Sequence, residues 1–203
     1  MEVKIITDDD NYENIEHLDF VKHDRRSALM HNKFCIMDSK KVFTGSMNPT
    51  LNGVYKNNNN MVIIESEKVV ELFEEEFDEM WNGEFGKGNR TDSEIVLFCP
   101  EDNCAKKIIE EIQKANQSIY FTAFSFTHDA IATELLLKHY QGIEVKGVFE
   151  KTRISKYSKY HILKHHGVDV RYDKNKYVMH HKFWIIDNRT VITGSFNPSY
   201  SAD

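Results

Sequence analysis

Cysteine is scarce in this sequence, with Cys35, Cys99 and Cys104 as the three examples among 203 residues. Their odd number and the lack of a Cys-x-x-Cys spacing favour free thiols over disulfides. Free thiols are typical of a reducing compartment, so we expect a cytoplasmic protein. The spacing of Cys99 and Cys104 also gives little reason to assign them as metal ligands.

The sequence also lacks long apolar runs and a surplus of positive charge. No apolar stretch reaches transmembrane length, and the first residues, MEVKIITDDD, contain no basic region followed by an apolar run. We therefore expect neither a transmembrane segment nor a secretory signal. The 26 Lys and Arg residues stand against 32 Asp and Glu, a formal net charge of −6, which does not by itself indicate a nucleic-acid or membrane binder. Much of the negative charge falls in residues 71–79, which leaves local basic stretches possible elsewhere.

One stretch occurs twice, and the two copies match without a gap. They are residues 30–49 (MHNKFCIMDSKKVFTGSMNP) and residues 179–198 (MHHKFWIIDNRTVITGSFNP). The equivalent polar residues and glycines are His31, Lys33, Asp38, Gly45, Ser46 and Asn48 in the first copy, and His180, Lys182, Asp187, Gly194, Ser195 and Asn197 in the second. A lone His on a strand is usually structural, but two copies with one fixed spacing favour a catalytic geometry.

Each copy has the pattern of a β-hairpin, with an apolar run, a turn and a second apolar run that leads into Gly-Ser. The turns are predicted at residues 39–40 and 188–189. The two-residue period of a strand puts His31 and Lys33 on one face, where a rigid strand would hold them in a cleft. The opposite face would enter the core, through Phe34, Ile36, Phe183 and Ile185.

Further regular elements follow from periodicity and from glycine and capping signals. Helices are expected at residues 67–81, 105–117, 129–140 and 155–166, and strands at 61–65, 118–126 and 143–149. The αβαβα order of the second half favours an α/β sandwich with a largely parallel or mixed sheet. We expect a first lobe at residues 1–82, a glycine-rich linker at 83–94 and a second lobe at 95–203.

The repeat extends upstream of the twin stretch. The two copies of the stretch are 149 residues apart, as His31 and His180 show. At this offset His17 matches His166 and Val21 matches Val170, and residues 2–4 align with residues 144–146 after a short length change. The first lobe lacks a counterpart of the second lobe's opening strand and helix, and the second lacks the closing strand and helix. We therefore interpret the chain as a fragment of a longer two-lobe protein, with both lobes incomplete.

The motif His-x-Lys-x4-Asp followed by Gly-Ser-x-Asn, present twice, resembles the phospholipase D superfamily of phosphodiesterases. The resemblance implies a phospholipase D-like α/β sandwich of two pseudo-symmetric lobes, each with a mixed sheet flanked by helices. It also implies hydrolysis through a phosphohistidine intermediate. Gly-Ser-Met-Asn-Pro-Thr and Gly-Ser-Phe-Asn-Pro-Ser resemble the nuclease-like branch, because the Asp-x-Arg-Ser type continuation of lipid-processing members is missing.

Phosphoryl transfer needs in-line attack, charge neutralisation and a proton for the leaving oxygen. One neutral imidazole of the pair His31 and His180 can attack phosphorus, while the other protonates the leaving alcohol and later deprotonates water. Lys33 and Lys182 would neutralise the phosphate oxygens, so we expect no metal ion and no cofactor. The other phosphate-binding candidates are Ser46, Asn48, Ser195 and Asn197. Asp38 and Asp187 complete the two catalytic motifs, in a structural role behind the histidines.

The division of labour between the histidines rests on Asn59. Nuclease-like relatives usually have a Glu there that orients the catalytic His, and an uncharged Asn would favour imidazolium less. This makes His31 the better nucleophile and His180 the better acid. We expect the two imidazoles to face one another across one cleft, about a pseudo-twofold axis, within roughly 4 to 8 Å.

Nucleic acid is the expected substrate, whether DNA or RNA. A basic stretch with interleaved aromatics supports it, since it could follow a phosphate backbone; an ordinary solvated helix face is the alternative. Its members are Lys151, Arg153, Lys156, Lys159 and Lys164, with Tyr157 and Tyr160. Two other functions stay open. They are a phospholipase D or phosphatidyltransferase that acts on phospholipid, similar to cardiolipin synthase, and a non-catalytic phosphate-binding module.

Overall fold

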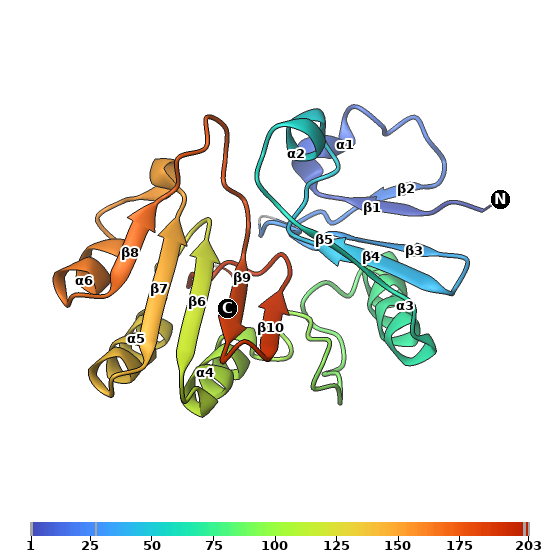
Figure 1. The fold of residues 1–203 in the computed structure, drawn as a ribbon. Helices are drawn as coiled ribbons and strands as arrows, with labels where there is room; N and C mark the ends of the chain where they lie inside the picture. The colour runs from blue at the N-terminus through green and yellow to red at the C-terminus, as the bar shows by residue number, and fades with distance from the viewer. Residues whose placement is uncertain (1, 27, 201, 203) are drawn as a thin grey trace. The chain divides into compact units, whose positions relative to one another are not determined.

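The computed structural model describes residues 2–26, 28–200 and 202. Contacts divide the chain into two compact units, each built from two stretches of sequence. Unit 1 comprises Met1–Phe43 and Ile63–Asp102, and unit 2 comprises Thr44–Val62 and Asn103–Asp203. Figure 1 labels the helices and strands of both.

The N-terminal half contains two small sheets. Strands β1 (Ile5–Thr7) and β2 (Val21–His23) pair in parallel, and the short helix α1 (Asp9–Tyr12) follows β1. The second sheet has the order β3-β4-β5. Its strands are β3 (Phe34–Met37), β4 (Lys41–Gly45) and β5 (Met61–Ile64), with helix α2 (Leu51–Tyr55) between β4 and β5 in sequence.

Helix α3 (Glu67–Trp81) has the bounds that the sequence predicts. Its apolar residues recur every three or four positions, so they form one stripe that can be buried. The stripe packs with Val42 of β4 and with Phe98, and Phe34 and Ile36 of β3 contact this core as predicted. The buried residues of α3 are Val69, Val70, Phe73 and Met80.

Unit 2 is built around a five-stranded mixed sheet in the order β10-β9-β6-β7-β8 (Figure 1). The strands β6, β7 and β8 are parallel, while β9 runs antiparallel to both β6 and β10. The predicted mixed α/β fold, with sheets flanked by helices, is therefore confirmed. In chain order its elements are α4 (Cys104–Lys114), β6 (Ser118–Ala123), α5 (Asp129–Tyr140), β7 (Glu144–Phe149), the 3₁₀ turn η1 (Lys151–Arg153), α6 (Tyr160–His165), β8 (Asp169–Tyr172), β9 (Phe183–Ile186) and β10 (Thr190–Thr193).

The core of unit 2 joins α4 and α5 to the sheet, with Ile112, Ile131 and Leu135 fully buried. The prediction that Phe183 and Ile185 enter the core is wrong. Trp184 and Ile186 do so instead, because β9 lies inside the sheet and the face that carries these two residues is the one packed on the helices. The predicted helix at residues 155–166 is also shorter, since α6 begins at Tyr160 and the segment before it contains η1 and loop.

The upstream repeat is visible in the strand registers. Ile5 pairs with Val21 in the first copy, and Gly147 pairs with Val170 in the second. These are equivalent positions in the alignment predicted from sequence, so β1 and β2 correspond to the ends of β7 and β8. The same local structure is thus built twice from different residues.

The cysteines depart from the prediction. Cys99 and Cys104 are disulfide-bonded, and Cys35 is a free, exposed thiol. The two bonded residues lie close enough in sequence for a short loop to bring them together. An odd number of cysteines does not exclude a disulfide between two of them. The argument from free thiols to a reducing compartment therefore fails.

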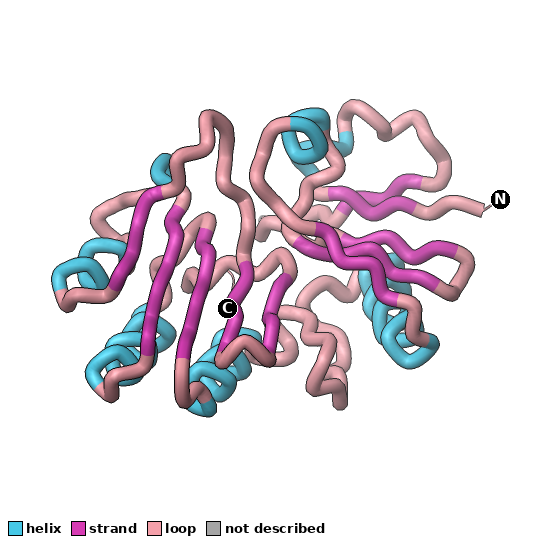
Figure 2. Tube along the Cα trace, viewed as in Figure 1, coloured by secondary structure: helices cyan, strands magenta, loops and turns pink. Residues whose placement is uncertain are grey.

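Residues 83–94 contain no helix or strand, and Figure 2 shows the region between α3 and α4 as loop. The segment is nevertheless packed within unit 1, since Phe85 is buried and Thr91 donates hydrogen bonds from its N–H and its hydroxyl to the Asp102 carboxylate. The lobe boundaries at residues 82 and 95 stay a prediction. No helix in the described part of the chain is both long enough and apolar enough to cross a membrane.

Candidate active site

The His-Lys pair has the same local geometry in both copies. Lys33 Nζ donates to the backbone carbonyl of His31 at 2.9 Å, and Lys182 Nζ donates to that of His180 at 2.9 Å. Each pair lies in the segment just before a strand, β3 or β9, and not in the strand itself as predicted. Each ammonium is thereby fixed beside its own histidine.

The two pairs are buried to different degrees. In the second copy His180 is 7% exposed and Lys182 is 3% exposed, while His31 and Lys33 are half-buried. Burial lowers the pKa of Lys33 to about 8, and the negative charge of Asp8 opposes that change in part. The charge of this ammonium therefore depends on pH close to neutrality.

The motif aspartates occupy the hairpin turns. Asp38 and Ser39 have φ of 52° and 51°, and Asp187 and Asn188 have φ of 53° in both cases. Two consecutive residues with positive φ are characteristic of a tight hairpin turn whose twist matches the strands, and Asp and Asn tolerate this conformation. The turns therefore begin one residue earlier than predicted.

The Asp187 side chain also accepts hydrogen bonds from the segment that enters β6. Its carboxylate accepts the backbone N–H groups of Asn116, Gln117 and Ser118 at 2.9, 2.8 and 2.9 Å. These hydrogen bonds, led by that from Ser118, hold the pKa of Asp187 below its ordinary value. The carboxylate fixes the β9–β10 turn to the start of β6.

The Gly-Ser part of the first copy is packed against Asn60. Gly45 has φ of 142°, and a Cβ there would lie 2.4 Å from the carbonyl oxygen of Asn60, so only glycine fits. Ser46 is fully buried and is bonded to Asn60 three times, through Ser46 N to Asn60 O, Ser46 Oγ to Asn60 Oδ1, and Asn60 N to Ser46 Oγ. This exchange holds the carbonyl of Ser46 in one direction.

That carbonyl holds His180. Nδ1 of His180 donates to Ser46 O at 2.8 Å, and His180 N donates to Asn58 O at 2.6 Å. A carbonyl can only accept, so Nδ1 of His180 carries the proton of this hydrogen bond. All these residues belong to unit 2, so the first copy of the motif positions the histidine of the second.

Phe124 brings three functional groups together at the end of β6. Its ring centroid lies 4.6 Å from that of His180, 4.9 Å from Lys182 Nζ and 4.8 Å from the guanidinium carbon of Arg153. Strand order explains the proximity. Because β9 pairs antiparallel with β6, from Thr122↔Phe183, the residues that precede β9 lie beside the residues that follow β6.

The remaining predicted residues are placed less tightly. Asn48 and Ser195 are half-buried in the loops after β4 and β10. Asn197 has a buried Oδ1 without a hydrogen-bond partner among the described residues. The side chain of Asn59 donates to the carbonyls of Gly53 and Asn57. His31, Lys33 and Asp38 belong to unit 1, so the facing of the two histidines stays a prediction.

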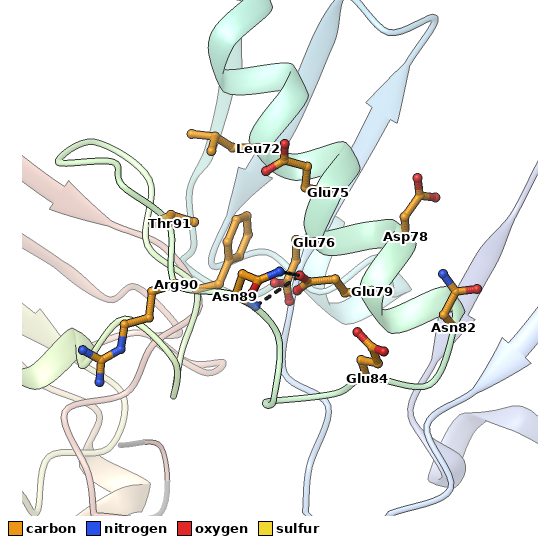
Figure 3. A pocket seen from close by; sticks show the side chains of 11 residues that line it. Leu72, Glu75, Glu76, Asp78, Glu79, Asn82, Glu84, Asn89, Arg90 and Thr91 are labelled. Carbon is orange, nitrogen blue, oxygen red and sulfur yellow. Dashed lines mark hydrogen bonds between the residues drawn. The ribbon is translucent and has the colours of Figure 1, made fainter.

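A separate cavity of about 450 Å³ lies against α3 in unit 1 (Figure 3). Its charged lining is mostly acidic, which would repel a phosphodiester. One member reaches the first motif, because Glu76 Oε1 accepts the Asn32 amide at 3.0 Å. Burial, followed by the charge of Glu101, raises the pKa of Glu76 to about 7. The charged lining consists of Glu75, Glu76, Asp78, Glu79, Glu84 and Arg90.

The described residues contain no cluster of three or more His, Cys, Asp or Glu side chains arranged to hold a metal ion. Metal-independent turnover itself stays a prediction.

Sequence reasoning missed three contributors to this site. One is Asn60, the neighbour of the predicted Asn59. It lies directly before β5, so the predicted strand at residues 61–65 was a signal for its position. The others are Phe124, which follows β6, and Glu150, which follows β7 and accepts a hydrogen bond from Met179 N. Residues at the carboxyl ends of adjacent parallel strands gather at one edge of a sheet. That rule was the available signal.

Comparison with protein families agrees with this geometry. The family model described as "Cardiolipin synthase, PLD-like domain" matches residues 1–81 and 108–202. This covers most of the chain, which therefore belongs to the phospholipase D superfamily, as predicted. Members of this superfamily include phosphodiesterase hydrolases such as phospholipase D.

Similar curated proteins carry lipid names. Phospholipase D of Rickettsia prowazekii (strain Madrid E) is 36% identical over 109 residues, which are 53% of this chain and 53% of that protein. Mitochondrial cardiolipin hydrolase of Canis lupus familiaris is 44% identical over 61 residues, 30% of this chain and 24% of that protein. The chain thus spans about half the length of the rickettsial relatives that it matches.

Solved structures also resemble this chain. The phospholipase D family member Nuc from Salmonella typhimurium is 30% identical, with a TM-score of 0.49 over 52% of this chain and 71% of that chain. Polyphosphate kinase from Porphyromonas gingivalis has a TM-score of 0.63 over 90% of this chain and 30% of that chain. At 10% identity the latter is a likeness of fold alone.

Proposed function

We propose that this chain hydrolyses phosphodiester bonds through a phosphohistidine intermediate, with nucleic acid as the substrate. The observation that carries the proposal is the fixed imidazole of His180, whose Nδ1 donates to Ser46 O while Lys182 is held beside it. A histidine fixed in one tautomer beside a buried cation is what attack on phosphorus, or protonation of a leaving oxygen, requires.

The reaction proceeds in two displacements. Nε2 of one histidine attacks phosphorus and the bond to the leaving oxygen breaks, while the imidazolium of the other histidine gives that oxygen its proton. The same second histidine then takes a proton from water, whose oxygen attacks the phosphohistidine and frees the first imidazole. We assign attack to His31 and proton transfer to His180, with Lys33 and Lys182 on the non-bridging oxygens. No metal ion takes part in these steps.

Arg153 favours nucleic acid over phospholipid. It is exposed, it lies over the Phe124 ring that also contacts His180 and Lys182, and among the described residues its guanidinium has no carboxylate partner. A strand carries a further phosphate and a base beside each cleaved bond, and a guanidinium can bind the first and stack on the second. Other members of the basic stretch are engaged, since Lys159 pairs with Asp129.

Phospholipid is the second candidate, and the names of the rickettsial and canine relatives favour it. A choline headgroup carries a positive charge next to its phosphate, which Arg153 would repel. Cardiolipin carries a second phosphate, which Arg153 would attract. The position of Arg153 therefore favours nucleic acid over phosphatidylcholine but not over cardiolipin.

The test is a substrate panel of single-stranded DNA, duplex DNA, RNA, phosphatidylcholine and cardiolipin, with bis(p-nitrophenyl) phosphate as a diester that has one phosphate. We expect turnover of the small diester and of single-stranded nucleic acid. Arg153→Gln should lower kcat/KM on an oligonucleotide about tenfold more than on the small diester, as for loss of one charge-assisted hydrogen bond. Lys156→Gln is the matched control, because its ammonium lies over Tyr157 rather than Phe124.

The outcomes separate the candidates. Turnover of cardiolipin without nucleic acid would reject the proposed substrate, and equal losses on both diesters would reject the role of Arg153. Phosphate binding without turnover of any diester would favour the non-catalytic module.

A further inference from the structure

In both copies of the repeat, a carboxylate accepts the backbone N–H that directly precedes the motif histidine. Asp8 Oδ2 accepts from Met30 N at 2.9 Å, and Glu150 Oε2 accepts from Met179 N at 2.6 Å. Met30 and Met179 are followed by His31 and His180. Neither carboxylate belongs to the twin motif itself.

The two carboxylates occupy one structural position. Asp8 follows β1 and Glu150 follows β7, and these strands pair with β2 and β8 in the same register. The position is filled by Asp once and by Glu once, so what the two copies share is the carboxylate and its target rather than the side chain. Two occurrences within separately packed units make chance a poor explanation.

Glu150 is the more deeply buried of the pair, at 1% exposed. A buried carboxylate is unfavourable unless hydrogen bonds replace its lost water. Here Oε2 accepts Met179 N, while Oε1 accepts Thr152 N at 2.8 Å and Thr152 Oγ1 at 2.6 Å. Both oxygens are thus satisfied, and one carboxylate ties the η1 turn to the segment that enters His180.

Other hydrogen bonds also hold the main chain around His180. Val178 O accepts from Asn58 N, His180 N donates to Asn58 O, and His180 O accepts from Lys182 Nζ. Met179 N donates to Glu150 Oε2. Without that contact a buried N–H would be unpaired directly before the histidine.

We infer that Asp8 and Glu150 are positioning residues, which hold the histidine of each motif by fixing the amide in front of it. The inference rests on the proposed function, which gives His31 and His180 their chemistry. Hydrogen bonds to a carboxylate are shorter and stronger than neutral ones, so they restrict the backbone more tightly. A displacement of about 1 Å at a reacting group can cost on the order of 10²-fold in rate.

The test replaces each carboxylate by its isosteric amide, Glu150→Gln and Asp8→Asn. An amide offers one oxygen and one NH₂ group, so Gln must turn a donor toward Met179 N–H or toward Thr152 N–H. Asn at position 8 can keep its oxygen on Asp10 N, which caps α1, and lose only the contact to Met30. Thr152→Val is the matched control, because it removes a donor to Glu150 Oε1 and leaves Oε2 in place.

The first readout needs no activity. In ¹H–¹⁵N spectra of the full chain, the amide protons of Met30 and Met179 should resonate far downfield, as donors to carboxylates do. Asp8→Asn should move only the first upfield, and Glu150→Gln the second. The Nδ1–H proton of His180 should exchange faster with water in Glu150→Gln, while Thr152→Val should leave these signals in place. Unmoved signals in both amide variants would overturn the inference.

The second readout is kinetic. We expect each amide variant to lose about 10- to 100-fold in kcat with KM within about threefold, and Glu150→Asp to recover part of the loss. Moved amide signals with unchanged kcat would overturn the positioning role. If the wild-type chain turned over no diester, the proposed function would fail, while the amide signals and the exchange of the His180 proton would still decide whether the carboxylates hold the histidines.

Discussion

Lys33 should impose an alkaline limit on activity. Its side chain is half-buried and donates to His31 O at 2.9 Å, and this burial lowers its pKa to about 8. The charged form is lost as pH rises through that value, so the cation that we propose for phosphate binding disappears. At about pH 9, one unit above the pKa, roughly a tenth of the molecules keep the ammonium, and kcat/KM should be about tenfold below its neutral plateau.

Lys33→Arg is the perturbation that isolates this effect. A guanidinium keeps its charge over the whole range, although its larger plane will lower the plateau itself. The informative quantity is therefore the ratio of kcat/KM at about pH 7 to that at about pH 9 within each protein, which should fall from roughly ten to roughly one in the variant. Lys40→Arg, on the exposed hairpin turn, is the control and should keep the wild-type ratio.

The assay measures initial rates on bis(p-nitrophenyl) phosphate, with product quantified after quenching at one fixed pH so that its absorbance does not vary. Because the free-enzyme pKa governs kcat/KM, substrate must be kept well below KM. An undiminished alkaline limb in Lys33→Arg would refute the reasoning, since the titrating group would then be another residue.

Three further predictions concern metal, packing and pH. EDTA should leave phosphodiesterase activity unchanged, because lysines and asparagines supply the phosphate contacts; loss with chelator and recovery with Mg²⁺ would contradict this. Gly45→Ala should destabilise the chain by at least about 2 kcal/mol in urea unfolding, because its Cβ would meet Asn60 O at 2.4 Å, whereas Gly194→Ala meets nothing within 4 Å and should cost far less. Glu76 has a pKa raised by burial, so it lowers stability as pH rises from 4.5 through about 7, and Glu76→Gln should be more stable than wild type by about 1 to 3 kcal/mol at pH 8 but not at pH 4. A constant difference across that range would count against the assignment.

Local pattern was enough to predict much of the fold. Helices α3 and α5 have the predicted bounds, because each presents a clear apolar stripe or ends at a glycine signal such as Gly142. The hairpins and the upstream repeat were also visible, since a gap-free duplication fixes equivalent positions without knowledge of the fold. These features depend on residues close together in sequence.

Features that depend on pairing between distant strands could not be predicted in the same way. Which face of β9 enters the core depends on its place between β6 and β10, and this reversed the roles of Ile185 and Ile186. The acceptor of His180 is a backbone carbonyl, that of Ser46, and a carbonyl has no signature in sequence.

Charge and cysteine patterns were also incomplete guides. The basic stretch from Lys151 does not form one helix face, because η1 and loop precede α6 and Lys159 is paired with Asp129. Arg153 is the member that lies over the Phe124 ring, and its role in substrate binding is our proposal. An odd cysteine count says nothing of whether two of the three are neighbours in space.

The central claim is that the twin motifs form a phosphohistidine during turnover, with His31 as nucleophile and His180 as acid. The most direct measurement is acid quench of a single turnover with a ³²P-labelled nitrophenyl diester, followed by mapping of the labelled peptide. A nitrophenolate leaves without a proton, so His180→Asn should still trap label on the peptide that contains His31, and His31→Asn should trap none. Label on the His180 peptide would reverse the assignment, and label on neither peptide in wild type would contradict the covalent mechanism.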